Sequence, residues 1–367
     1  MSDASAQDDD PLRQRQAHAY GKARRRLAVV DGIVGAVVLI AIVAAAGTLG
    51  GWGCVAALIL LPALISLPFG LIRHRLSRAN GLSRQTVGGW LGDWAKGLAV
   101  GLVLGIPAAL AVLGLQRAFP DWWVVPTWAG ALVLSAALAV LFPVLLLPLF
   151  LKSRPIDPGP VADEVWGLVR RSGVDVREVR SLLMSEKTSE SNAMVAGLGP
   201  TRRVYVGDTL AEGVEDEQQA LGELRVVLAH ELGHQKHHDI WRLLAWSAIS
   251  LAVGLGAAWA AVAWLSPSGG GHRTSLPALV LGFSVGSSVV SPAGHGDSRR
   301  REWAADRYAI ELTGEGPLFA AAFERLVTAN LAELRPPRLW YLLTASHPAP
   351  ADRIAFARNP SSEQDLH

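Results

Sequence analysis

Long apolar stretches alternate with polar segments along the chain. Six of them come close to or exceed the roughly 20 residues that a helix needs to cross the hydrocarbon core of a bilayer. Pro143 and Pro148 lie in the fourth stretch and predict either a kink or a helix that continues beyond the membrane. The pattern predicts a mainly α-helical polytopic membrane protein with about six transmembrane helices. The stretches run over residues 27–49, 53–72, 97–115, 126–151, 243–265 and 276–293.

The polar segments between the spans predict a soluble domain made from two separate pieces of chain. Residues 161–172 have the pattern of an amphipathic helix, 203–206 that of a short strand, and 217–238 carry apolar residues at helical spacing. A further helical pattern covers 300–312. We expect an α+β domain. The expected boundaries are a flexible tail over 1–26, a membrane region of four spans over 27–151, soluble pieces over 152–242 and 294–360 on either side of two spans over 243–293, and a flexible tail over 361–367.

Composition agrees with this division. Half of the 367 residues are apolar and only 18% are charged, and the mean hydropathy is +0.28. These values are typical of a chain with several segments in lipid. The formal net charge of +2 gives no reason to expect nucleic acid as a partner. Cys54 is the single cysteine, so any chemistry has to come from histidines and carboxylates.

Positive charge predicts the orientation of the spans. Arginines and lysines gather before the first span, between the second and third spans, and after the sixth span. By the positive-inside rule, the N-terminus, both soluble pieces and the C-terminal tail face the cytoplasm. We therefore expect an integral membrane protein, in the plasma membrane of a bacterium, with its active site on the cytoplasmic side.

One short motif can carry chemistry. His230-Glu231-Leu232-Gly233-His234 lies on the helix predicted over 217–238. The i, i+4 spacing places both imidazoles on one face, where they can bind a single Zn²⁺ ion. Glu231 is then placed to accept a proton from the metal-bound water as a general base. The alternative is two surface histidines on a helix near the membrane.

Catalytic zinc takes three protein ligands, so a third is needed from elsewhere. Glu302, in the sequence Glu302-Trp-Ala-Ala-Asp306, is the best candidate, because the i, i+4 spacing presents both carboxylates on one helix face. One of them could bind zinc while the other accepts the free ring N–H of a ligand histidine. An ordinary solvated Glu and Asp among arginines would have the same spacing. His237 and His238 lie further along the first helix, out of reach of the same ion.

With these motifs in place, the chain resembles the integral-membrane zinc peptidases that include the type 1 CAAX prenyl proteases and the HtpX-type proteases. The resemblance covers most of the chain from Gly81 onward and is closer to the CAAX branch. The motifs that carry it, in order, are Gly81-Leu-Ser-Arg-Gln-Thr86, Asp93 with Lys96, Pro148-Leu-Phe150, Ser191-Asn192-Ala193, Gly207-Asp208-Thr209-Leu210, the zinc motif, Glu302 to Asp306, and Ser346-His347-Pro348 with Arg353.

The resemblance implies roles for individual residues. Glu302 would be the third zinc ligand, and Asp306 would hold a ligand histidine, His230. The remaining residues would line the cleft and bind substrate: Asn192 and Ala193 on an edge strand that pairs with the extended peptide, Arg353 near the site, and His347 as a donor that stabilises the oxyanion. A structural tail that packs on the motif helix is the alternative for His347 and Arg353.

The sequence therefore predicts a membrane-embedded zinc metalloendopeptidase with a peptide or protein substrate and the lipid bilayer as its surroundings. A CAAX prenyl protease-like processing enzyme is the leading interpretation. The alternatives are an HtpX-like quality-control protease and a zinc-domain signal transducer. The chain has six expected spans where the eukaryotic CAAX proteases have seven.

Overall fold

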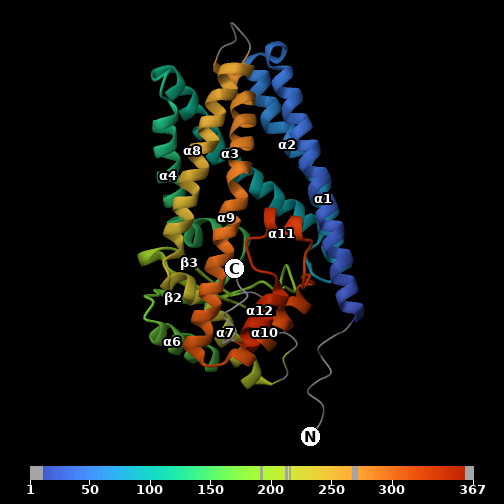
Figure 1. The fold of residues 1–367 in the computed structure, drawn as a ribbon, viewed down its shortest axis with the longest axis vertical. Helices are drawn as coiled ribbons and strands as arrows, with labels where there is room; N and C mark the ends of the chain where they lie inside the picture. Colours follow the sequence, from blue (N-terminus) through green and yellow to red (C-terminus); the bar gives the residue numbers. More distant parts are fainter. Residues whose placement is uncertain (1–10, 191–192, 211–213, 215, 267–271, 360–367) are drawn as a thin grey trace.

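The computed structural model of the protein describes residues 11–190, 193–210, 214, 216–266 and 272–359. Long helices gather at one end of the molecule, and a small sheet with shorter helices forms the other end (Figure 1). Residues 1–10 of the first expected tail, the whole second tail over 361–367, and residue 360 lie outside the described residues.

Within the described residues, six helices are long and apolar enough to cross a membrane, which confirms the expected number of spans. Four of the six are single helices, and α2 has a kink at Gly50, where φ is 65°. The fourth span passes from α4 into the π-helical turn η1 (Phe142–Leu146) and the short helix α5 (Leu147–Phe150), where the two prolines predicted a disturbance. The helices are α1 (Pro11–Ala44), α2 (Ala46–Ala79), α3 (Val87–Ala118), α4 (Val124–Leu141), α8 (Asp239–Leu265) and α9 (Leu276–Thr313).

The N-terminal segment differs from the expectation. Residues 11–26 were expected to belong to a flexible tail, but α1 is helical from Pro11. Ala17 and Tyr20 are buried against Leu82 and Leu331, so this polar stretch has one apolar face that packs on the rest of the protein. Its charged residues also form ion pairs, for example Arg25 with the carboxylate of Glu333.

A second difference concerns α9. The sequence predicted a span over 276–293 and a separate helix over 300–312, whereas the structure has one continuous helix, drawn in orange in Figure 1. This helix packs closely on α8, because a Cβ atom on Gly282 would lie 2.5 Å from the carbonyl oxygen of Ala257. Small residues at such a crossing let two membrane helices approach each other. The soluble end of α9 therefore continues directly from a candidate membrane span that is packed against α8.

The sheet of the described residues has four strands, in the order β1-β2-β4-β3. β2 and β4 run parallel, and the two outer pairs are antiparallel. β4 matches the strand that the sequence pattern predicted, and β3 contains Ala193, which the resemblance placed on an edge strand; β1 and β2 were not foreseen. β3 lies at an edge, with β4 as its one neighbour in this sheet. The bounds are β1 (Ser153–Pro155), β2 (Glu178–Leu182), β3 (Ala193–Ala196) and β4 (Arg203–Gly207).

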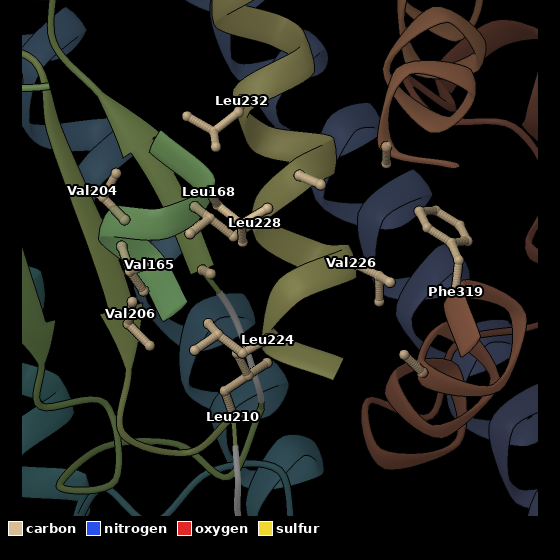
Figure 2. Packing of buried hydrophobic residues seen from close by; sticks show 14 of the residues in the cluster. Val165, Leu168, Val204, Val206, Leu210, Leu224, Val226, Leu228, Leu232 and Phe319 are labelled. Atoms are coloured by element: carbon tan, nitrogen blue, oxygen red, sulfur yellow. The ribbon is translucent and has the colours of Figure 1, made fainter. Parts of the chain in front are cut away.

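The helices α6 (Pro160–Ser172) and α7 (Glu217–Lys236) form the core of the soluble domain with this sheet. Val165 and Leu168 of α6, Val204 of β4 and Leu228 of α7 meet between them and are fully buried (Figure 2). Each such side chain stabilises the fold by about 1.5–3 kcal/mol relative to exposure. The remaining elements are η2 (Gly199–Thr201), η3 (His272–Ser275), α10 (Gly316–Ala329), α11 (Arg338–Thr344) and α12 (Pro350–Arg358).

Candidate metal centre

The centre forms where α7 crosses α9. Gly233, inside the histidine motif, permits this close crossing. A Cβ atom at this position would lie 3.1 Å from Cα of Ala305 and 3.2 Å from Cδ1 of Tyr308. The close approach brings Glu302 of α9, one turn from Ala305, to the face of α7 that carries His230 and His234.

Three side chains converge at this crossing. Nε2 of His230 and Nε2 of His234 are 3.2 Å apart. The Glu302 carboxylate lies 3.4 Å from the first of these nitrogens and 3.5 Å from the second. One ligand atom from each residue lies within 4.8 Å of the others. The structure thus brings together the three residues expected to bind zinc.

Each imidazole is oriented by a carboxylate on its other nitrogen. Nδ1 of His230 lies 2.8 Å from Asp306, as the resemblance implied. Nδ1 of His234 lies 2.7 Å from Asp239, the first residue of α8. Because these carboxylates accept the Nδ1 protons, both Nε2 atoms present lone pairs to the same point. Asp239 was missed in the sequence analysis, although it stands only five positions after His234.

The donor set fits a zinc ion. Two imidazole nitrogens and a carboxylate are a usual catalytic zinc set. Oε2 of Glu302 is buried and has no hydrogen-bond partner among the described residues. The surroundings of His230 also favour positive charge. Burial opposes protonation of this ring, but the hydrogen bond to Asp306 and the nearby Glu302 carboxylate have the larger effect. Together they raise the pKa of His230 to about 9. A cation between these atoms would satisfy all of them.

Glu231 points toward the edge strand. Its carboxylate accepts a hydrogen bond from the backbone amide of Val195 in β3, and burial raises its pKa above the ordinary value. One turn later, Nε2 of Gln235 lies 3.4 Å from the carbonyl oxygen of Val195. The motif helix and the edge strand are therefore directly connected beside the metal centre.

The residues expected to contact substrate are found in different settings. Ala193 begins β3 and is buried, and Asn192 lies outside the described residues. The His347 side chain is 62% exposed, with Nε2 3.3 Å from the Glu302 carboxylate. Arg353 is buried instead, with its Nε donating to Asp306 at 2.7 Å and its guanidinium 4.2 Å from the centre of the Phe323 ring. Arg353 thus pairs with Asp306, and it also lines the cavity that opens beside the centre.

A cavity of about 440 Å³ opens beside the centre. Its polar wall contains His230, Glu302 and Glu231, and most of its remaining wall is apolar. The sequence analysis did not identify the apolar wall, because α10 supplies much of it and carries no motif. The apolar lining includes Val226, Val227, Phe319, Ala322, Phe323 and Leu326.

Two family models match the chain. The model of peptidase family M48 matches residues 159–361, and that of the CAAX prenyl protease N-terminal region, described as five membrane helices, matches residues 10–152. The described part of this second stretch contains four helices that are long and apolar enough to span a membrane.

Individual proteins match over most of their length. The chain is 29% identical over 329 residues to the uncharacterized metalloprotease YhfN of Bacillus subtilis, which covers 85% of this chain and 75% of YhfN. It is 25% identical to the CAAX prenyl protease 1 homolog of Arabidopsis thaliana, over 79% of this chain and 69% of that protein. The human homolog is 24% identical, over 80% of this chain and 70% of its own length.

A solved structure has the same fold. The crystal structure of S. mikatae Ste24p superimposes with a TM-score of 0.79 and 20% sequence identity, over 97% of this chain and 90% of that one.

Proposed function

The chain belongs to peptidase family M48 and is a membrane metalloprotease with the N-terminal region of the CAAX prenyl proteases. We propose that it hydrolyses peptide bonds with Glu231 as the general base. The N-terminal match favours the CAAX-protease branch over the HtpX-type branch. The observation that carries the proposal is the convergence of His230, His234 and Glu302 on one point beside Glu231.

His230, His234 and Glu302 would hold zinc, one ion per chain. When bound there, the ion would polarise the scissile carbonyl and lower the pKa of water at the site. Asp306 and Asp239 keep the two histidine rings turned toward this point. Arg353 keeps Asp306 in place through its fork of hydrogen bonds.

Glu231 moves the proton. Its carboxylate takes a proton from the water that attacks the scissile carbonyl and passes it to the leaving amine. Its raised pKa, which results from burial, suits a group that has to accept and then release a proton. The hydrogen bond from Val195 holds the carboxylate at the boundary between the metal centre and β3.

His347 supplies a donor for the oxyanion in this proposal. Nδ1 of its ring lies 2.9 Å from Oγ of Ser346, and Nε2 faces the metal centre. A preorganised N–H at this position would stabilise negative charge that develops on the carbonyl oxygen. The large exposure of the ring supports a role toward substrate over one in packing.

The substrate is a peptide in extended conformation. β3 is an edge strand beside Glu231, and an edge strand can accept a further strand through backbone hydrogen bonds. We propose that Asn192 and Ala193 contribute to this contact. The apolar cavity next to the centre would then accept an apolar side chain close to the scissile bond.

The active site faces the cytoplasm in this proposal. Arginines lie at the ends of α1 and α2 next to the soluble domain, as the positive-inside rule requires for a cytoplasmic side. The sheet and the helices α6, α7, α10 and α12 of both soluble pieces lie on that same side of the spans (Figure 1).

The decisive experiment compares wild type, Glu231→Gln and Glu302→Ala in detergent, with zinc content and cleavage of labelled peptides as readouts. We expect Glu231→Gln to keep its zinc and to lose cleavage, and Glu302→Ala to lose zinc. Glu217→Gln is the matched control, because Glu217 lies exposed at the start of the same helix. A wild type without zinc, or a Glu231→Gln variant that still cleaves, would refute the proposal.

A further inference from the structure

Four segments that carried the family resemblance take no part in the metal centre. They are residues 81–86, the pair Asp93 and Lys96, residues 148–150, and residues 207–210. In the structure all four contact one loop, residues 183–190, which connects β2 to the segment before β3. This loop is hereafter the strand-leading loop. These contacts indicate that the four segments have the same role, which is to hold this loop in place.

The first segment pairs with the strand-leading loop through the backbone. The amide of Arg84 donates to the carbonyl of Lys187 at 2.9 Å, and Ser83 and Thr188 form an isolated antiparallel bridge. Leu82 contributes its carbonyl, which accepts from the hydroxyl of Thr188 at 2.8 Å. The turn between α2 and α3 thus behaves as a short strand beside the loop.

The second and third segments both contact the side chain of Lys187 in the loop. The carboxylate of Asp93, in α3, accepts hydrogen bonds from Lys187, from Gln85 at 2.7 Å and from Lys96 at 3.2 Å. Lys187 also donates to the carbonyl of Phe150, at the end of the fourth span. One half-buried ion pair therefore joins two membrane segments to the strand-leading loop.

The fourth segment holds the loop from the peptidase side. Asp208 accepts hydrogen bonds from the amides of Met184 and Ser185 at 2.8 and 2.9 Å and from the hydroxyl of Ser185 at 2.6 Å. The hydroxyl of Thr209 donates to the carbonyl of Glu190 at 2.9 Å. Both ends of the loop are bound to the residues that directly follow β4, and its middle is bound to the membrane region.

We propose that Asp93 and Lys187 are positioning residues for the substrate-binding strand, so that the membrane region sets the place of β3 in the cleft. β3 has four residues and, in the described sheet, one neighbouring strand, so its own ladder constrains it weakly. The loop that leads to it is where further constraint can act. The inference rests on the proposed function, because it assumes that β3 binds the peptide.

The expected effect is on substrate binding. A strand that pairs with substrate does so in the ground state and in the transition state, so a displaced strand raises KM more than it lowers kcat. Lys187→Met and Asp93→Asn should each raise KM for a peptide by about tenfold, the equivalent of one or two weakened hydrogen bonds. kcat should change by less than about threefold, and zinc content should not change.

A double variant, a conservative variant and a control ion pair on the same loop test the Asp93–Lys187 pair. The double variant should resemble the single variants, because residues that act through one contact are not additive. Lys187→Arg keeps a donor and the charge and should restore most of the affinity. The matched control is the exposed pair Lys152–Glu186 at 3.0 Å, which involves the same loop but no membrane helix. Lys152→Met should leave KM unchanged.

The outcomes separate this inference from the proposed function. Wild-type cleavage that Glu231→Gln abolishes establishes the function, whatever the Lys187 variants do. An unchanged KM in Lys187→Met and Asp93→Asn would overturn the inference. A lower kcat with loss of zinc at unchanged KM would also overturn it, because it would mean general damage to the fold. Hydrogen exchange gives a second measurement: the amides of β3 should exchange faster in Lys187→Met than in wild type and the Lys152→Met control.

Discussion

Asp239 accepts a hydrogen bond from Nδ1 of His234 at 2.7 Å, across the junction between the motif helix and the next membrane span. His238, between the two helices, has the left-handed backbone conformation with φ of 55°, which turns the chain back so that Asp239 faces the motif. The first residue of a membrane helix therefore orients a proposed metal ligand. His230 has the matching arrangement with Asp306, from the opposite helix.

Asp239→Asn should weaken zinc binding about 10- to 100-fold while the fold is retained, because the ring of His234 loses the carboxylate that fixes its orientation. Competition with a chelator of known affinity measures the effect. His237→Gln is the control, since His237 directly follows the same helix but packs against the ring of Tyr308. Equal zinc affinity in Asp239→Asn and wild type would contradict the assigned role.

Arg353→Met should destabilise the protein strongly. The substitution leaves the fully buried carboxylate of Asp306 without its guanidinium partner, and breaking a buried pair in this way costs about 3–5 kcal/mol. Thermal unfolding in detergent should show a clear fall in Tm. Arg335→Met removes an exposed ion pair with Asp352, so it should cost no more than about 1 kcal/mol. Similar Tm values for the two variants would argue against a supporting role for Arg353.

Removal of zinc by a chelator should lower the Tm of the wild type, and added zinc should restore it. A ligand that binds only the folded state contributes about 2.7 kcal/mol at 100 times its dissociation constant. Glu302→Ala should unfold at a temperature that no longer depends on zinc. If this variant responds to zinc as the wild type does, Glu302 is not a ligand.

Val227→Phe should change which peptides are cleaved. Val227 lines the apolar cavity beside the metal centre, so a larger side chain leaves less room for substrate. We expect kcat/KM to fall at least about tenfold for peptides with a bulky apolar residue next to the scissile bond, and less for peptides with alanine there. Competition between the two peptides measures the ratio. Leu221→Phe, on the same helix but beside a different cavity, should leave it unchanged.

Local patterns were sufficient for part of this structure. The six spans follow from apolar runs, and the two histidines of the motif face one point because their i, i+4 spacing dictates it. Glu302 could be named as a candidate because its helix repeats that spacing. These features depend on residues close together in the sequence.

Other features depend on contacts that no local pattern encodes. The polar stretch around Tyr20 was interpreted as a flexible tail, because its helix is stabilised by packing on Leu82 and Leu331, far away in the sequence. The ion pair of Arg353 with Asp306 was not predicted, because the two residues are 47 positions apart and no local pattern connects them. The continuity of α9 was missed because the polar residues after 293 resemble the end of a span.

Because α9 is continuous, a movement of its membrane-spanning part also moves Glu302. Leu276 and Glu302 belong to one helix, and they lie about 39 Å apart along its axis at 1.5 Å per residue. A tilt of about 5° around the far end of such a rod moves the Glu302 end by about 3 Å, comparable to the distances between the ligand atoms at the centre. Because a membrane helix can tilt to match the thickness of the bilayer, a change in that thickness should alter the geometry of the proposed metal site.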